Sequence, residues 1–154
     1  MVKKKFNSLI VGFGSIGNRH TKNLKNLGYE NIDIFRTFKN KTKYPQINKI
    51  NILKNFDEAL KKKKYDLIIL ANPTSKHVSY AIKGAKKGAN IYIEKPLSNS
   101  LKNTKLLQAI EKNKKIKIMI GCQLRYHANL IYVKRIIEKK TLIFIQNFIE
   151  HLQT

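Results

Sequence analysis

Three glycines, Gly12, Gly14 and Gly17, form a Gly-x-Gly-x-x-Gly motif directly after the apolar run at residues 6–11. Between a strand and a helix, the first glycine allows a tight turn and the second lets a pyrophosphate approach the backbone. The third lets the helix lie close to the strand. The free N–H groups and the positive end of a helix beginning at Ser15 would then face the phosphates. The motif therefore predicts dinucleotide binding, and a purely structural glycine turn is the alternative.

The choice between NAD and NADP is expected to depend on the end of the second predicted strand. An acidic residue there, about twenty positions past the glycines, binds the ribose 2′-OH of NAD, whereas a basic one accommodates the phosphate of NADP. Arg36 and Thr37 occupy this place, while Asp33 lies mid-strand with its carboxylate too far back. We expect a preference for NADP over NAD; stacking of Arg36 on the adenine is the alternative.

Four motifs, in this order along the chain, resemble the Gfo/Idh/MocA oxidoreductases (glucose–fructose oxidoreductase, inositol dehydrogenase, rhizopine catabolism). They are Val11-Gly-Phe-Gly-Ser-Ile-Gly-Asn-Arg-His20, Ala71-Asn-Pro-Thr-Ser-Lys-His77, Glu94-Lys95-Pro96-Leu97-Ser98 and Arg125-Tyr126-His127. The first is similar to members found in surface-polysaccharide sugar pathways. The resemblance spans about residues 6 to 138 and implies an NAD(P)-dependent oxidoreductase acting on the CH–OH group of a sugar or polyol. A non-catalytic dinucleotide-binding module is the alternative.

The resemblance implies that Lys95 is catalytic, because the matching lysine binds the reacting hydroxyl or carbonyl beside the nicotinamide. When hydride leaves carbon, the hydroxyl proton must go elsewhere, and a cation stabilises the developing alkoxide. Family members tend to have a cis bond before the residue that matches Pro96. Glu94 is expected to orient the loop and the cofactor.

The other candidate cofactor-binding residues lie where predicted strands end. They are Phe13, Ser15 and Ile16 in the glycine turn, Ala71, Asn72, Pro73, Thr74 and His77 after the fourth strand, Glu94 and Lys95 after the fifth, and Arg125 after the sixth. His77 has a second interpretation, as a helix-surface residue. His127 follows the same strand as Arg125. No cluster of Cys, His and Asp has metal-ligand spacing, so we expect no metal.

Strand and helix patterns alternate along the chain, which predicts an α/β fold: a Rossmann-type, doubly wound parallel sheet of about six strands. We expect strands at residues 6–11, 31–35, 50–53, 66–71, 90–93 and 116–120. We expect helices at 15–27, 55–60, 75–87 and 127–139, and another from Ser98 or Ser100 to 111. Asn55 and Ser75 are expected to cap helices, and Gly28 and Gly88 to end them.

The composition argues against a membrane-spanning protein and against a specific nucleic-acid-binding protein. The 154 residues suit one domain, and no apolar run is long enough to predict a membrane span. The net charge of +23 comes from scattered lysines, with arginine only at Arg19, Arg36, Arg125 and Arg135. We therefore expect no specific nucleic-acid partner and no membrane partner. A lone cysteine, Cys122, fits a reducing cytoplasm and is expected to be a buried apolar filler.

Residues 1–139 are predicted to form the NAD(P)-binding domain, and residues 140–154 a truncated start of a second domain or an aberrant tail. The resemblance implies a second α/β domain that supplies an aspartate and a histidine and could join subunits into a homo-oligomer. Neither residue can be matched here, so we expect little turnover from these residues alone. A strand at 142–145 lies within an apolar stretch, 142–149, that we expect to self-associate as an unpaired edge.

Overall fold

A computed structural model of the chain describes residues 6–37 and 50–138. The strands are β1 (Ser8–Val11), β2 (Ile32–Phe35), β3 (Asn51–Leu53), β4 (Leu67–Leu70), β5 (Asn90–Glu94) and β6 (Ile118–Gly121). All of their pairings are parallel, in the order β3-β2-β1-β4-β5-β6. The order reverses between β1 and β4, which is the arrangement of a doubly wound sheet. The predicted fold class is therefore confirmed.

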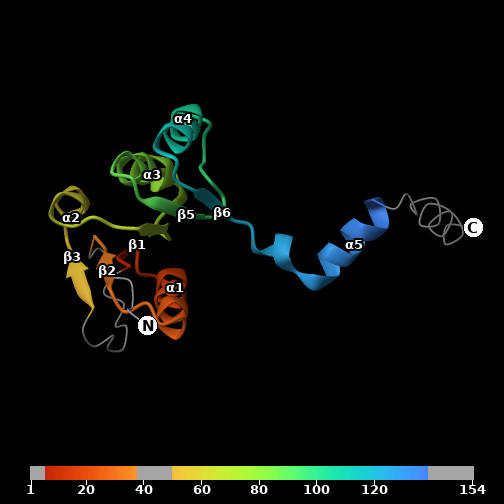
Figure 1. Cartoon of the computed structure of the whole chain (residues 1–154), viewed down its shortest axis with the longest axis horizontal. Coiled ribbons are helices and arrows are strands. Elements are labelled where there is room, and N and C mark those ends of the chain that lie inside the picture. The colour runs from red at the N-terminus through yellow and green to blue at the C-terminus, as the bar shows by residue number, and fades with distance from the viewer. Residues whose placement is uncertain (1–5, 38–49, 139–154) are drawn as a thin grey trace, which may run out of the picture. The chain divides into compact units, whose positions relative to one another are not determined.

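Helices cover both faces of this sheet (Figure 1). They are α1 (Ser15–Asn26), α2 (Phe56–Lys62), α3 (His77–Lys86) and α4 (Thr104–Lys114). A short 3₁₀ helix, η1 (Thr74–Lys76), directly precedes α3 and buries none of its residues. The larger core packs α2, α3 and α4 against alternate residues of the central strands, such as Leu9, Ile68 and Ile91. The smaller core packs α1 against the other face, where Ile10 and Ile69 lie. Because successive side chains of a strand point to opposite faces of the sheet, each central strand contributes apolar side chains to both cores.

Two predicted helix starts are wrong. Pro73 is followed by the 3₁₀ helix η1, so α3 begins at His77 and Ser75 caps nothing. Neither Ser98 nor Ser100 begins α4; the chain first makes a turn in which the hydroxyl of Ser98 accepts from the backbone N–H of Ser100. The helix then starts after Asn103, whose φ of 63° is left-handed. Gly28 and Gly88, with φ near +84° and +83°, end α1 and α3 as expected.

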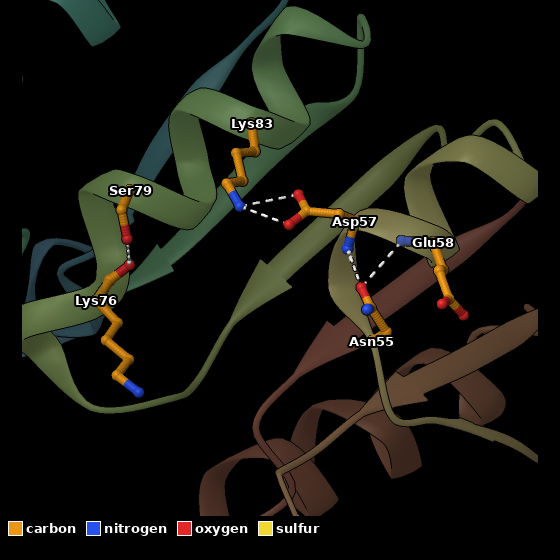
Figure 2. Close-up of polar contacts among 6 residues, drawn as sticks. All are labelled: Asn55, Asp57, Glu58, Lys76, Ser79 and Lys83. Carbon is orange, nitrogen blue, oxygen red and sulfur yellow. Dashed lines mark hydrogen bonds and ion pairs between the residues drawn. The ribbon is translucent and has the colours of Figure 1, made fainter.

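Polar contacts cap α2 and link it to α3 (Figure 2). The side chain of Asn55 accepts from the backbone N–H groups of Asp57 and Glu58, which confirms it as the cap of α2. The carboxylate of Asp57 then binds the ammonium of Lys83 on α3, with N–O distances of 2.8 and 2.7 Å. Both side chains are about half exposed, so this pair links the two helices at the surface and adds little stability.

Asp33 lies in the middle of β2 and is buried. One of its oxygens, Oδ2, accepts from the ammonium of Lys63 at 2.9 Å and from the hydroxyl of Tyr65 at 2.8 Å. Burial of Tyr65 raises the pKa of its hydroxyl well above the usual value, and the hydrogen bond to Asp33 and the charge of that carboxylate raise it further. Asp33 is therefore a structural residue of the sheet.

Tyr65→Phe is expected to remove a pH-dependent part of the stability. Because folding raises the pKa of Tyr65, its contribution is fully present below the unfolded pKa of about 10 and is lost as the pH rises toward the folded value. Denaturant unfolding of both proteins at about pH 8 and about pH 10.5 tests this, because every other ionisable group is present in both proteins. The stability difference should shrink at the higher pH; an equal difference at both would contradict the assignment.

The chain divides into two compact units, Met1–Gly121 and Cys122–Thr154. In the second, the 3₁₀ helix η2 (Gln123–Tyr126) leads into α5 (Ala128–Glu138). Cys122 is exposed, so its prediction as a buried filler is wrong: the strand has ended and the residue lies in the turn before η2. The predicted strand at 142–145, the apolar stretch 142–149 and the domain boundary after residue 139 lie outside the described residues. Within those residues, no helix is long and apolar enough to cross a bilayer.

Candidate functional site

The glycine turn joins the carboxyl end of β1 to α1, and two of its glycines are required by packing. Gly12 has a φ of +92°, and a Cβ there would lie 2.7 Å from the carbonyl oxygen of Ala71. A Cβ at Gly17 would overlap the carbonyl oxygen of Gly12. These contacts support the roles expected for the first and third glycines of the motif, the tight turn and the close approach of helix to strand.

Gly14 is the N-cap of α1 and differs from the other two glycines. Its backbone is extended, with φ of −84° and ψ of −164°, and no side chain caps the helix. A Cβ added there would meet no atom within 4 Å. The first N–H groups of a helix lack partners within the helix and carry its positive dipole end. Open space beside such a terminus fits a pyrophosphate.

Asn72 follows β4 and lies directly against the glycine turn, since a Cβ at Gly12 would come within 2.8 Å of its Cα. Both polar atoms of its side-chain amide are buried and have no hydrogen-bond partner within the described residues. A buried amide without partners is costly, and such groups in native structures call for an explanation. A bound group offering both a donor and an acceptor would satisfy this amide, so it fits a dinucleotide held at the turn.

Lys95 follows β5 at the same edge of the sheet and is exposed. The bond from Lys95 to Pro96 is cis, as the family resemblance implied. Both neighbours of Lys95 are held by histidines: Nε2 of His20 lies 2.6 Å from Oε1 of Glu94, and Nδ1 of His77 lies 3.0 Å from the carbonyl oxygen of Pro96. The lysine side chain therefore extends from a backbone fixed on both sides.

The contact of His20 was not predicted from the sequence, and one interpretation of His77 is wrong. His20 closes the glycine-containing motif on α1, which was the signal available, but its partner Glu94 lies 74 residues away. His77 is only 1% exposed, so it is not a helix-surface residue. Its Nε2 lies 2.8 Å from the carbonyl oxygen of Asn72. A direct contact of His77 with cofactor stays a prediction.

Arg36 directly follows β2, and this strand end is bonded to the glycine turn. The carbonyl oxygen of Phe35 accepts from the backbone N–H of Gly12 at 2.9 Å, and the backbone N–H of Arg36 donates to Leu53 at 3.3 Å. Arg36 is half-buried and Thr37 is exposed. Asp33 is held by Lys63 and Tyr65, so its carboxylate is already engaged within the sheet.

The structure brings most of the predicted site residues to one edge of the sheet. At the carboxyl ends of β1, β2, β4 and β5 lie Gly12, Phe13, Gly14, Ser15, Ile16, Gly17, Arg36, Thr37, Ala71, Asn72, Pro73, Thr74, Glu94 and Lys95. Arg125 lies in η2, in the unit described by itself, so its contact with a cofactor stays a prediction. Residues 6–37 and 50–138 contain no group of three His, Cys, Asp or Glu that could hold a metal ion.

Comparisons with known proteins agree with this arrangement. A family model described as an oxidoreductase family with an NAD-binding Rossmann fold matches residues 6–122. A candidate oxidoreductase from Bacteroides fragilis is 27% identical, with a TM-score of 0.69, over 89% of this chain and 41% of that chain. The WlbA dehydrogenase from Bordetella pertussis, in complex with NADH and UDP-GlcNAcA, is 23% identical, with a TM-score of 0.76, over 88% and 42%.

A third solved structure is scyllo-inositol dehydrogenase from Lactobacillus casei, with bound NAD(H) and scyllo-inositol. It is 16% identical, with a TM-score of 0.73, over 90% of this chain and 42% of that chain. For the two proteins that are less than 25% identical to this chain, the similarity shows a shared fold and no more. The chain spans 41–42% of the length of these three proteins.

Proposed function

The chain belongs to the Gfo/Idh/MocA oxidoreductase family, and we propose that it is the cofactor-binding part of a dehydrogenase that acts on a sugar or polyol. One observation carries the proposal: an exposed lysine, Lys95, lies at the sheet edge that also holds the open glycine turn and the unpaired amide of Asn72. Open α/β sheets bind ligands in the crevice at this edge.

The substrate class is supported by the chemistry of two proteins with the same fold. One binds scyllo-inositol and NAD(H), and the other binds UDP-GlcNAcA and NADH. Both organic ligands carry several hydroxyl groups on a ring. We therefore propose a cyclic polyol or a nucleotide-linked sugar as the substrate class of this chain.

The residues of the chain have distinct tasks in this reaction. A bound nicotinamide supplies the acceptor or donor of hydride. The glycine turn and the first turn of α1 hold the pyrophosphate through backbone N–H groups, and Asn72 gains the hydrogen bonds that it lacks in the free chain. When a substrate CH–OH group is oxidised, its hydride would go to the nicotinamide and its hydroxyl proton to solvent water at the open sheet edge. The ammonium of Lys95 would stabilise the negative charge that develops on the oxygen.

The test combines binding with turnover. Calorimetric titration of the chain with NAD and NADP measures affinity, and the absorbance of reduced nicotinamide reports turnover with a panel of inositols, hexoses and UDP-linked sugars. We expect dinucleotide binding with only slow hydride transfer, because no aspartate and histidine partner can be matched in these residues. Lys95→Ala should abolish the transfer while the dinucleotide affinity stays within about threefold. Binding without transfer to any substrate would favour the alternative, a non-catalytic dinucleotide-binding module. No binding of either dinucleotide would overturn both functions.

Arg36→Asp is expected to change the cofactor preference. We propose that the wild-type chain binds NADP more tightly than NAD by about tenfold, because a guanidinium forms strong paired hydrogen bonds to a phosphate. The variant should reverse this order by binding the 2′-OH of NAD and repelling the phosphate. Titration of both proteins with both cofactors measures the ratio.

Lys25→Asp makes the same charge change in the last turn of α1, away from the carboxyl edge of the sheet. This control should leave the ratio unchanged. A preference for NAD in the wild-type chain, or the same ratio in Arg36→Asp, would refute the proposal.

We further propose a reducing compartment, the cytoplasm, because the single cysteine, Cys122, is an exposed free thiol. The scattered lysines support weak, salt-sensitive attraction to polyanions rather than a specific nucleic-acid partner. A homo-oligomer built through a second domain remains part of the proposal.

A further inference from the structure

We propose that His20 and His77 are positioning residues that hold the backbone of Lys95 from both sides, an inference that rests on the proposed function. His20 lies on α1, the helix whose N-terminus faces the pyrophosphate site, and binds Glu94. His77 begins α3 and contacts the loops that follow β4 and β5. The two histidines thereby connect the cofactor-binding elements to the loop that carries the lysine.

The contact between His20 and Glu94 follows from the alternation of side chains along β5. Ile91 and Ile93 enter the core under α3 and α4, whereas Tyr92 packs against the core on the other face, beneath α1. Glu94 is two residues beyond Tyr92 and so shares its face. The carboxylate accepts from the ring N–H of His20 at 2.6 Å, with both side chains about one-fifth exposed.

Tyr92 supports the His20 ring from the side. The two rings meet edge to face, with centroids 5.1 Å apart and an interplanar angle of 65°. The tyrosine can occupy this place because Gly121, on the neighbouring strand β6, has no side chain: a Cβ there would lie 2.5 Å from the tyrosine hydroxyl oxygen. The His20 ring is therefore oriented by packing as well as by its hydrogen bond.

The second support, His77, is almost fully buried. Its Nδ1 lies 3.0 Å from the carbonyl oxygen of Pro96, and its Nε2 lies 2.8 Å from the carbonyl oxygen of Asn72. Carbonyl oxygens only accept, so a neutral imidazole donates to one of them and a protonated imidazole to both. The His77 ring thus lies between the backbone of Pro96, which follows Lys95, and the backbone of Asn72, whose side-chain amide has no partner among the described residues.

A held backbone matters because the lysine works through its position. The Lys95 side chain is exposed, and its four-carbon stem is flexible. A misplacement of about 1 Å can cost about a hundredfold in rate. Fixing Glu94 and Pro96 fixes the point on the carboxyl edge of the sheet from which the lysine side chain extends.

The test compares His20→Leu, which removes the donor, with His20→Gln, whose amide N–H can replace it. NMR of the dinucleotide-free chain follows the Lys95 backbone amide signal and its heteronuclear NOE. We expect His20→Leu to shift the signal and lower the NOE, and His20→Gln to restore both toward wild type. The slow hydride transfer that depends on Lys95 should fall at least about tenfold in His20→Leu, with dinucleotide affinity within about threefold of wild type.

Lys83→Leu breaks the similarly short Asp57–Lys83 pair on the other face of the sheet and should leave the Lys95 signal unchanged. His77→Gln, checked for folding by circular dichroism, should also shift that signal. An unchanged Lys95 signal in both His20→Leu and His77→Gln, or identical behaviour of His20→Leu and His20→Gln, would overturn the inference. Because the NMR measurement needs no cofactor, failure to bind NAD or NADP counts against the proposed function separately.

Discussion

Gly14→Val is expected to abolish binding of both NAD and NADP while the domain stays folded. A Cβ at Gly14 meets no protein atom within 4 Å, so the valine side chain enters the space that the pyrophosphate would use. The extended backbone, with φ of −84°, suits a β-branched residue. We expect an affinity loss of at least about 100-fold, which is about 2.7 kcal/mol. Calorimetric titration with both dinucleotides measures it.

Two controls separate lost binding from lost folding. Helix content of Gly14→Val should stay close to wild type, since the added atoms contact solvent rather than the core. Its melting temperature should fall by only a few degrees, because valine is a poorer N-cap than glycine. Gly14→Ala adds one carbon and should weaken binding less than valine does. Wild-type affinity in Gly14→Val would show that no phosphate lies at this turn, and a collapse of helix content would show that Gly14 has a packing role.

The sequence predicted the sheet well because its signals are local. The run at 66–71 is almost continuously apolar, as a strand buried on both faces requires, and the structure has β4 within it. Gly28 and Gly88 marked helix ends because an L side chain disfavours their left-handed backbone. Helix starts were harder to predict, because a serine that could cap a helix need not do so. The 3₁₀ helix after Pro73 delays the start of α3 beyond Ser75. Helix α4 begins only after the left-handed Asn103, beyond Ser98 and Ser100.

In the candidate site, too, features that depend on local spacing could be predicted from the sequence, and features that depend on strand order could not. The tasks of Gly12 and Gly17 could be inferred from spacing, because they depend on backbone approach within one turn. The contact between His20 and Glu94 could not, because it depends on strand order: β4 lies between β1 and β5, and α1 reaches Glu94 across it. The burial of His77 depends likewise on two loops that are distant in sequence from each other.

Asp33 shows why position along a strand matters for function. It is an acidic residue of β2, close to where an NAD-selecting carboxylate would stand. Yet Asp33 pairs in the middle of the sheet with Lys63 and Tyr65, while Arg36 follows the last residue of the strand. The expectation that Asp33 lies too far back therefore has a structural basis, and Arg36 is the residue to test for cofactor choice.

Gly17→Ala is expected to destabilise the fold, unlike the same change at Gly14. Its Cβ would overlap the carbonyl oxygen of Gly12, a backbone atom that cannot rotate away, so α1 must move off β1. Such overpacking costs about 3 kcal/mol, and the higher helix propensity of alanine returns about 1 kcal/mol. We therefore expect a net loss of about 2 kcal/mol in the free energy of unfolding, measured by denaturant titration.

Gly14→Ala is the matched control for Gly17→Ala, because it makes the same substitution in the same motif where a Cβ has free space. Its cost should stay below about 1 kcal/mol, the usual difference between glycine and alanine at a helix N-cap. Gly17→Ala should also weaken dinucleotide binding, since a displaced α1 carries its first N–H groups away from the phosphates. Equal stability of the two variants would mean that the helix can yield at Gly17 without cost, and the third glycine would then lack the packing role assigned to it.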